Sequence, residues 1–223
     1  MKLQLRAPVA EFFGTFGLVL SASSAGTLAS LGEPIGPLLD GLFSGIAVIA
    51  MILIFGKASG AHINPAVSVA MVRAGKLKKE QLPGYLLAQF SGAILASVVI
   101  RNLFPDAPSI GMNLPGSLGT FGSMWLEVLL TTILVGVIFW IIDQKWAVGP
   151  VPAIVIGLTV TAEVALAGSW SGASMNPARS FGPALVFSLA SGDLQSLQMV
   201  WIYFVGPVAG GLLAVTVCRI CKD

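Results

Sequence analysis

The tripeptide Asn-Pro-Ala occurs twice in this sequence, as Asn64-Pro65-Ala66 and as Asn176-Pro177-Ala178. A proline is well tolerated in the first turn of a helix, because its missing N–H would have no partner there. The asparagine before it can cap the helix with its side-chain oxygen and still offer its NH₂ group to a passing oxygen atom. The motif therefore predicts two short helices whose first turns carry hydrogen-bond donors.

Two such helices that meet at their N-termini would direct two positive dipole ends at one point. Cations would be repelled there. A water or hydroxyl oxygen that accepts bonds from both Asn64 and Asn176 could not also donate along a continuous chain of protons. The predicted chemistry is passage of neutral hydrogen-bonding molecules and exclusion of charges.

Arg179 lies three residues after Asn176 and is the cation of the second short apolar segment. An arginine inside a membrane indicates a functional site by default. The alternative is a surface arginine whose charge reaches the membrane edge along its apolar stem.

Three glutamates lie in apolar segments, namely Glu11, Glu127 and Glu163. Glu11 and Glu127 occupy similar positions in the two halves of the chain, and a proton relay is one role that such carboxylates can have in a membrane. Glu163 is expected either to bond to local backbone or to face an outer vestibule, and the sequence does not separate these alternatives.

His62, the one histidine, lies two residues before Asn64, so it is interpreted either as a structural hydrogen-bonding group or as a pH-sensitive gate. Cys218 and Cys221 near the end of the chain have no partner ligands for a metal site. We expect them to be ordinary residues at the end of a helix, with S-acylation as the alternative. The sequence predicts neither a cofactor nor a metal site.

The composition places these residues in a membrane. Hydrophobic residues make up 56% of the 223 residues and charged residues 10%, with a mean hydropathy of +0.90. Soluble domains carry about 25% charged residues, so lipid must cover this chain. The net charge of +2 is too small to indicate nucleic-acid binding.

A spanning helix needs about 20 apolar residues, and six segments qualify. They lie near Pro8–Leu31, Leu38–Phe55, Gln81–Leu103, Gly119–Ile142, Val151–Ala167 and Gln198–Val217. Two shorter apolar pieces, Pro65–Val72 and Pro177–Leu189, each open with proline and are predicted to be half-helices that start inside the membrane. The predicted fold class is an all-α membrane protein.

The lysines and arginines predict the orientation. All of the twelve except Arg101 and Arg179 fall at the termini, between the second and third spans or between the fourth and fifth. The positive-inside rule makes this side cytoplasmic, so both termini are expected in the cytoplasm. Short loops favour a plasma (inner) membrane.

The chain repeats itself within one channel domain, residues 1–223. Aligned from Ser59 and from Ser171, two ten-residue segments agree at seven positions. The repeats cover about 1–105 and about 118–223. Because each contains an odd number of spans, the second must be inserted upside down, which predicts a site at the bilayer midplane.

The paired motifs and their re-entrant positions resemble the aquaporin superfamily over essentially the full length. The resemblance implies six tilted helices, two half-helices that meet tip to tip, and a homotetramer with one pore per protomer. It also implies that Glu11 and Glu127 accept hydrogen bonds from the re-entrant loops, and that Arg179 lines the outer constriction.

In this family, selectivity depends on four constriction positions. Counted from the motifs, they fall on Ser44, Val164, Ala173 and Arg179, and a shift of one residue would put Phe43 in place of Ser44. Strict water channels of the family have Phe and His at the first two positions, and this chain has no histidine in its second half. Small residues there predict a wider opening.

The segment Val164–Asn176 is similar to nodulin-like intrinsic proteins and their bacterial relatives, a subgroup that conducts glycerol and neutral metalloid acids such as arsenous or boric acid. Classical glycerol channels of the family have Asn-Pro-Ala-Arg-Asp at the second motif, whereas Ser180 follows Arg179 in this chain. We therefore expect a passive channel for water and small uncharged solutes. The alternatives are a strict water channel and a proton-coupled secondary transporter, and no enzyme motif is visible.

Overall fold

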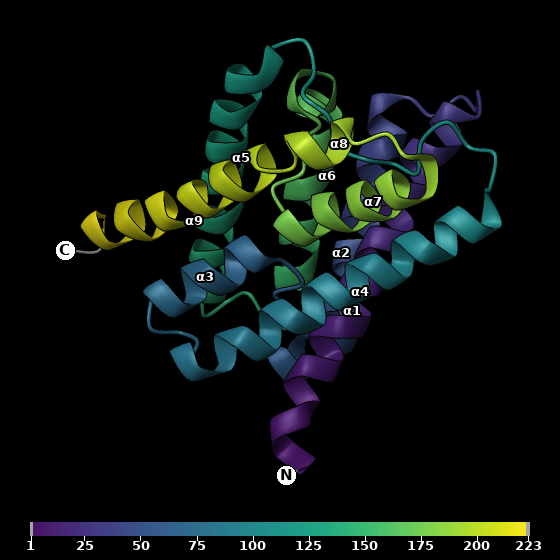
Figure 1. Cartoon of the computed structure of the whole chain (residues 1–223). Coiled ribbons are helices and arrows are strands. Elements are labelled where there is room, and N and C mark those ends of the chain that lie inside the picture. The colour runs from purple at the N-terminus through teal and green to yellow at the C-terminus, as the bar shows by residue number, and fades with distance from the viewer. Residues whose placement is uncertain (1, 222–223) are drawn as a thin grey trace.

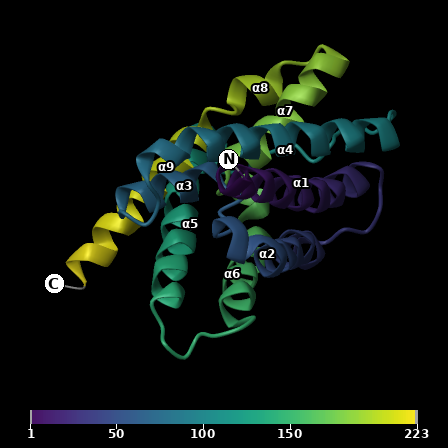
Figure 2. The same ribbon diagram turned by 90° about the horizontal axis from the view of Figure 1, so that it is seen from below.

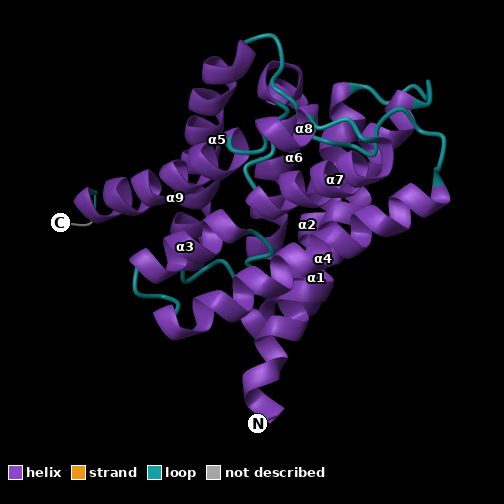
Figure 3. Ribbon diagram, in the orientation of Figure 1, coloured by secondary structure: helices purple, strands orange, loops and turns teal. Residues whose placement is uncertain are grey.

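The computed structural model describes residues 2–221, so Lys222, which contributed to the predicted orientation, lies outside it. The described chain is helical, with loops between the helices (Figure 3). Six segments are long and apolar enough to cross a membrane. The helices that build them are α1 (Lys2–Ser30), α2 (Pro37–Ser59), α4 (Leu82–Leu103), α5 (Gly119–Ile142), α6 (Val151–Ser171) and α9 (Ile202–Ile220).

The expected spans and the helices agree in number and order, and α5 agrees to the residue. Other helices run further than expected: α6 continues to Ser171, whose side chain is buried and donates to Glu127 of α5. The last span is broken into α8 (Gln195–Met199) and α9, and the short helix η1 (Lys79–Gln81) precedes α4.

The spans pack as pairs taken from different parts of the chain: α1 lies against α2 and α4, α6 against α2, and α5 against α9. Seen from below, α5 and α6 lie side by side (Figure 2). Glycines set the closest approaches. A Cβ on Gly45 of α2 would lie 1.9 Å from Thr161 Oγ1 on α6, and one on Gly210 of α9 would lie 2.3 Å from the carbonyl oxygen of Val128 on α5. Both glycines belong to Gly-x-x-x-Gly spacings that allow helices to approach closely.

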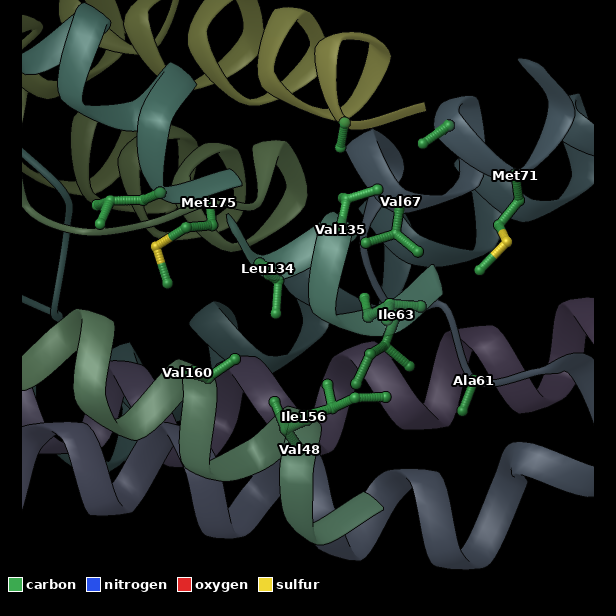
Figure 4. Close-up of a cluster of buried hydrophobic side chains, with 14 of the residues drawn as sticks. Val48, Ala61, Ile63, Val67, Met71, Leu134, Val135, Ile156, Val160 and Met175 are labelled. Atoms are coloured by element: carbon green, nitrogen blue, oxygen red, sulfur yellow. The ribbon is translucent and has the colours of Figure 1, made fainter. Parts of the chain in front are cut away.

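The two short apolar pieces form α3 (Pro65–Arg73) and α7 (Pro177–Ser191). Their first turns approach each other near the middle of the molecule (Figure 1). Apolar side chains from several helices surround the tip of α3 in one cluster, which includes Ile63, Val67, Leu134 and Val160 (Figure 4). The two half-helices are thus held inside the bundle by spans from both halves of the chain.

Candidate functional site: a pore between two half-helices

The two loops that lead into the half-helices share an unusual backbone. Gly60 and Gly172 end α2 and α6 with φ of 87° and 88°. In the residues that follow Gly60, positive φ occurs at every second position, so that Ala61 and Ile63 have φ of 45° and 46°. Ala173 and Met175 have φ of 39° and 52° in the second loop. Positive φ is unfavourable for residues with a Cβ, and most of all for a β-branched isoleucine, so other contacts must hold these loops.

Glu11 of α1 holds the first loop. Its Oε1 accepts hydrogen bonds from Ser59 Oγ at 2.6 Å and from the backbone N–H of His62 at 2.9 Å. Its Oε2 accepts from the backbone N–H of Ile63 and from Gln89 Nε2, both at 2.7 Å. The carboxylate is fully buried and has four donors.

Glu127 of α5 does the same for the second loop. Its Oε1 accepts from Ser171 Oγ at 3.0 Å and from the backbone N–H of Ser174 at 2.9 Å, and its Oε2 accepts from the backbone N–H of Met175 at 2.8 Å. These are contacts of the kind that the resemblance implied. Glu127 of α5 therefore binds the second loop through the same backbone positions that Glu11 of α1 binds in the first.

Each motif asparagine uses both ends of its amide. Asn64 Oδ1 accepts from the backbone N–H of Ala66 at 2.9 Å, and Asn176 Oδ1 accepts from that of Ala178 at 3.0 Å, so both residues cap their half-helices. Asn64 Nδ2 donates to the Met175 carbonyl oxygen and Asn176 Nδ2 to the Ile63 carbonyl oxygen, each at 2.8 Å. The two loops are thereby joined across the repeat, and each amide keeps a second N–H.

The remaining motif residues fill the junction. Pro65 and Pro177 occupy the first positions of α3 and α7. Ala66 and Ala178 have no exposed surface. Helix α9 packs closely on the first motif, since a Cβ on Gly211 would lie 3.2 Å from the Ala66 carbonyl oxygen.

A cavity of about 150 Å³ runs past both asparagines. Its lining contains all four residues counted from the motifs, namely Ser44, Val164, Ala173 and Arg179. Ser44, rather than Phe43, lines it, and Phe43 instead offers its carbonyl oxygen to Ser21 Oγ at 2.7 Å. Apolar side chains of α5 and α6, including Leu134, Ile138, Ile156 and Val160, continue the wall beyond the asparagines.

Arg179 is fixed by residues of the loop between α4 and α5. Its Nη1 donates to the Gly111 carbonyl oxygen at 3.0 Å and to Asn113 Oδ1. Asn113 Oδ1 also accepts from Ser180 Oγ at 2.9 Å, and its Nδ2 donates to the Gly172 carbonyl oxygen at 2.7 Å. The guanidinium is therefore held at the cavity wall and does not reach for a membrane surface.

Sequence reasoning missed Asn113, because an asparagine in a loop has no distinctive signal. It also missed Asp40, which lies one helical turn before Ser44 on α2 and lines a second cavity of about 170 Å³. That cavity shares Val164 with the first, so the two cavities lie next to each other.

His62 lines the first cavity, and its Nδ1 lies 3.1 Å from Ser68 Oγ. Its ring also packs on Tyr85, with the ring centroids 5.0 Å apart. Glu163 fits neither expected alternative. It is buried, and within the described part of the chain neither carboxylate oxygen has a hydrogen-bond partner.

Cys218 is half-buried, Cys221 is exposed, and both are free thiols. Among the residues that the structure describes, no group of His, Cys, Asp or Glu could hold a metal ion.

Residues 1–218 match the family model described as Major intrinsic protein. Aquaporin NIP1-1 of Zea mays is 39% identical over 208 residues, which cover 92% of this chain and 70% of that protein. Aquaporin NIP3-1 of Arabidopsis thaliana is 36% identical, with 92% of this chain and 64% of that protein covered.

Among solved structures, the chain is similar to the aquaglyceroporin from Plasmodium falciparum. The TM-score is 0.88 at 25% identity, and the match covers 98% of this chain and 99% of that one. The match covers both half-helices and all six spans, so the two proteins share one fold. The chain therefore belongs to the major intrinsic protein family, which makes it a membrane channel for water or small solutes and not an enzyme.

Proposed function

We propose that this channel passes water together with small uncharged solutes, namely glycerol and neutral metalloid acids such as arsenous or boric acid, and that it excludes ions and protons. The proposed solute range rests on the size of the side chains at the constriction. Ser44, Val164 and Ala173 give it small side chains, and Arg179 gives it one fixed donor group. Exclusion by diameter and by hydrogen-bond matching then admits solutes larger than water.

The names of the similar proteins support this range: the solved relative is called an aquaglyceroporin, and curated relatives are called NIP-type aquaporins. The sequence of the constriction supports the wider solute range independently, because Val164 occupies the position at which strict water channels of this family have a histidine. A strict water channel remains the first alternative, and solute flux separates the two.

Ion and proton exclusion rests on the centre of the pore. The first turns of α3 and α7 direct their positive dipole ends there, and Arg179 adds a full positive charge nearby. Asn64 and Asn176 each keep one amide N–H, since the other donates across the repeat. A single file of water whose central oxygen accepts from both amides cannot carry a continuous proton wire past them.

The second alternative, a proton-coupled transporter, needs glutamates that can take up and release protons along the pore. Glu11 and Glu127 are instead engaged by loop donors, and Glu163 is buried and does not line the cavity that passes the asparagines. Passive passage is therefore the better account of these carboxylates.

Orientation and assembly belong to the same proposal. The distribution of lysine and arginine supports cytoplasmic termini, and with them an outward-facing position for the cavity that Asp40 lines. Exposed apolar side chains such as Leu87, Trp125 and Leu166 can pack against lipid or against further copies of the chain, which is compatible with a homotetramer in a plasma (inner) membrane.

The test is stopped-flow light scattering on proteoliposomes with gradients of glycerol, arsenous acid or an impermeant osmolyte. We expect glycerol and arsenous acid to cross faster than in empty liposomes. Val164→His should narrow the opening and slow both solutes at least about tenfold, an added barrier of about 1.4 kcal/mol, while water flux changes less. If wild-type protein passes water alone, the strict water channel is the right reading. If nothing crosses, the channel is closed under these conditions and the proposal fails.

A further inference from the structure

Two cavities follow one another along three helices, of which α2 packs against both α1 and α6. On α2, Ser44 lines the first cavity and Asp40, four residues away, lines the second. On α6, Val160 lines the first cavity, Val164 lines both, and Gly168 lines the second. Residues four apart lie one above the other on a helix, so the second cavity begins one turn beyond the first on both helices.

Helix α1 shows the same order. Ala22 lines the first cavity, and Gly26 and Ala29 line the second. Along α1 and α6 the second cavity lies toward the C-terminal end, and along α2 toward the N-terminal end, which agrees with the short loop that joins α1 to α2. Three helices therefore place the second cavity as the continuation of the pore beyond Ser44 and Val164 of the constriction.

The wall of the second cavity is largely apolar, and Asp40 is the one charged residue among the described residues that line it. Its side chain is half-buried. Within residues 2–221 no group donates a hydrogen bond to its carboxylate, and it forms no ion pair. A carboxylate accepts hydrogen bonds at about four lone-pair sites and donates none. The acceptor capacity of Asp40 is thus open to whatever occupies the cavity.

The constriction offers the complementary group. Arg179 has donors only, and it lines the first cavity together with Ser44 and Val164. One helical turn rises about 5.4 Å, so a solute as long as glycerol can donate to Asp40 while its leading end enters the constriction. A hydroxyl group both donates and accepts, so a polyhydroxylated solute can use Asp40 as an acceptor and Arg179 as a donor.

We propose that Asp40 is a specificity-determining residue, whose carboxylate receives the O–H groups of neutral polyhydroxylated solutes in the cavity beside the constriction. This inference rests on the proposed function and names a residue that selects among its solutes. An O–H group that leaves water for an apolar cavity loses hydrogen bonds unless it finds an acceptor. Hydrogen bonds to an ionised group are stronger than those between neutral groups, so solutes with more hydroxyl groups gain more from Asp40.

Asp40 also lies in the first turn of α2, where a negative charge stabilises a helix. That structural role alone predicts a change in stability and the same change in flux for every solute. Discrimination between solutes of the same length separates it from the role proposed.

The test is stopped-flow light scattering on proteoliposomes with glycerol and with trimethylene glycol, which has the same carbon chain but lacks the middle hydroxyl group. Asp40→Leu removes the acceptors, so the ratio of glycerol to trimethylene glycol permeability should fall at least about threefold, the effect of about one hydrogen bond. Asp40→Asn keeps one acceptor oxygen and should lower the ratio less. Glu33→Gln removes an exposed carboxylate of the loop between α1 and α2 that lines neither cavity, and as the matched control it should leave the ratio unchanged.

An unchanged ratio in Asp40→Leu, or an equal loss of both solutes, would overturn the role of Asp40 and leave the proposed function intact. If Asp40→Leu yields no folded protein, Asp40→Asn decides, and a ratio equal to that of wild type would overturn the proposal. Wild-type protein that passes water and no glycerol would refute the proposed function itself, and this inference with it. The wild-type measurement therefore distinguishes the two failures.

Discussion

Replacing Glu127 with alanine would remove the acceptor of three buried donors at once: Ser171 Oγ and the backbone N–H groups of Ser174 and Met175. Each buried donor left without a partner costs about 1–3 kcal/mol. Even at the lower limit the three together amount to about 3 kcal/mol. The loop would also lose the contacts that hold Ala173 and Met175 at positive φ.

For a chain of this size, 1 kcal/mol shifts the melting temperature by about 2–4 °C, so Glu127→Ala should melt about 6–12 °C below wild type. Glu11→Ala should lose at least as much, since Glu11 has four donors. Glu127→Gln keeps one acceptor oxygen but turns an NH₂ group toward a donor, and it should fall between alanine and wild type. Intrinsic tryptophan fluorescence during heating in detergent measures all three.

Glu80→Ala, at an exposed side chain, is the control and should melt with the wild type. Water flux through Glu127→Ala proteoliposomes should fall although Glu127 is not part of the cavity wall, because the loop that it holds forms part of that wall. A melting temperature within about 2 °C of wild type would refute the reasoning, because it would mean that the three donors find other partners at little cost.

Other substitutions separate the parts of the pore. Arg179→Ala removes the fixed positive charge of the constriction and should raise proton leak in liposomes loaded with a pH-sensitive dye; leak equal to wild type would place the proton barrier at the asparagines alone. Asn113→Ala takes an acceptor from that arginine, a bond to a charged group worth about 1.5–3 kcal/mol, and should lower the melting temperature. Asn102→Ala, whose amide donates within its own helix, is its control and should not. Gly45→Val would place a side chain against Thr161 and separate α2 from α6, so folded protein should become scarce in size-exclusion chromatography; a normal yield would show that the helices can move apart.

The sequence alone was sufficient for the class of protein and the order of its elements. Long apolar runs with few charges can be stable only in lipid, and the positions of Pro65 and Pro177 mark where two short helices begin. Both are local properties of the chain. The repeated motif then predicted the inverted architecture, and the structural match to a solved relative agrees with it.

The tertiary structure decided what depends on helix rotation and on contacts between distant segments. One residue of error along α2 is a rotation of about 100°, so counting could not choose between Phe43 and Ser44, whereas packing of α2 on α1 and α6 turns Ser44 to the cavity. The bond from Arg179 to Asn113 spans 66 positions of sequence, and the amide bonds between the two loops span more than 110. No local pattern encodes such pairs, because they form only when the two inverted repeats close around one pore.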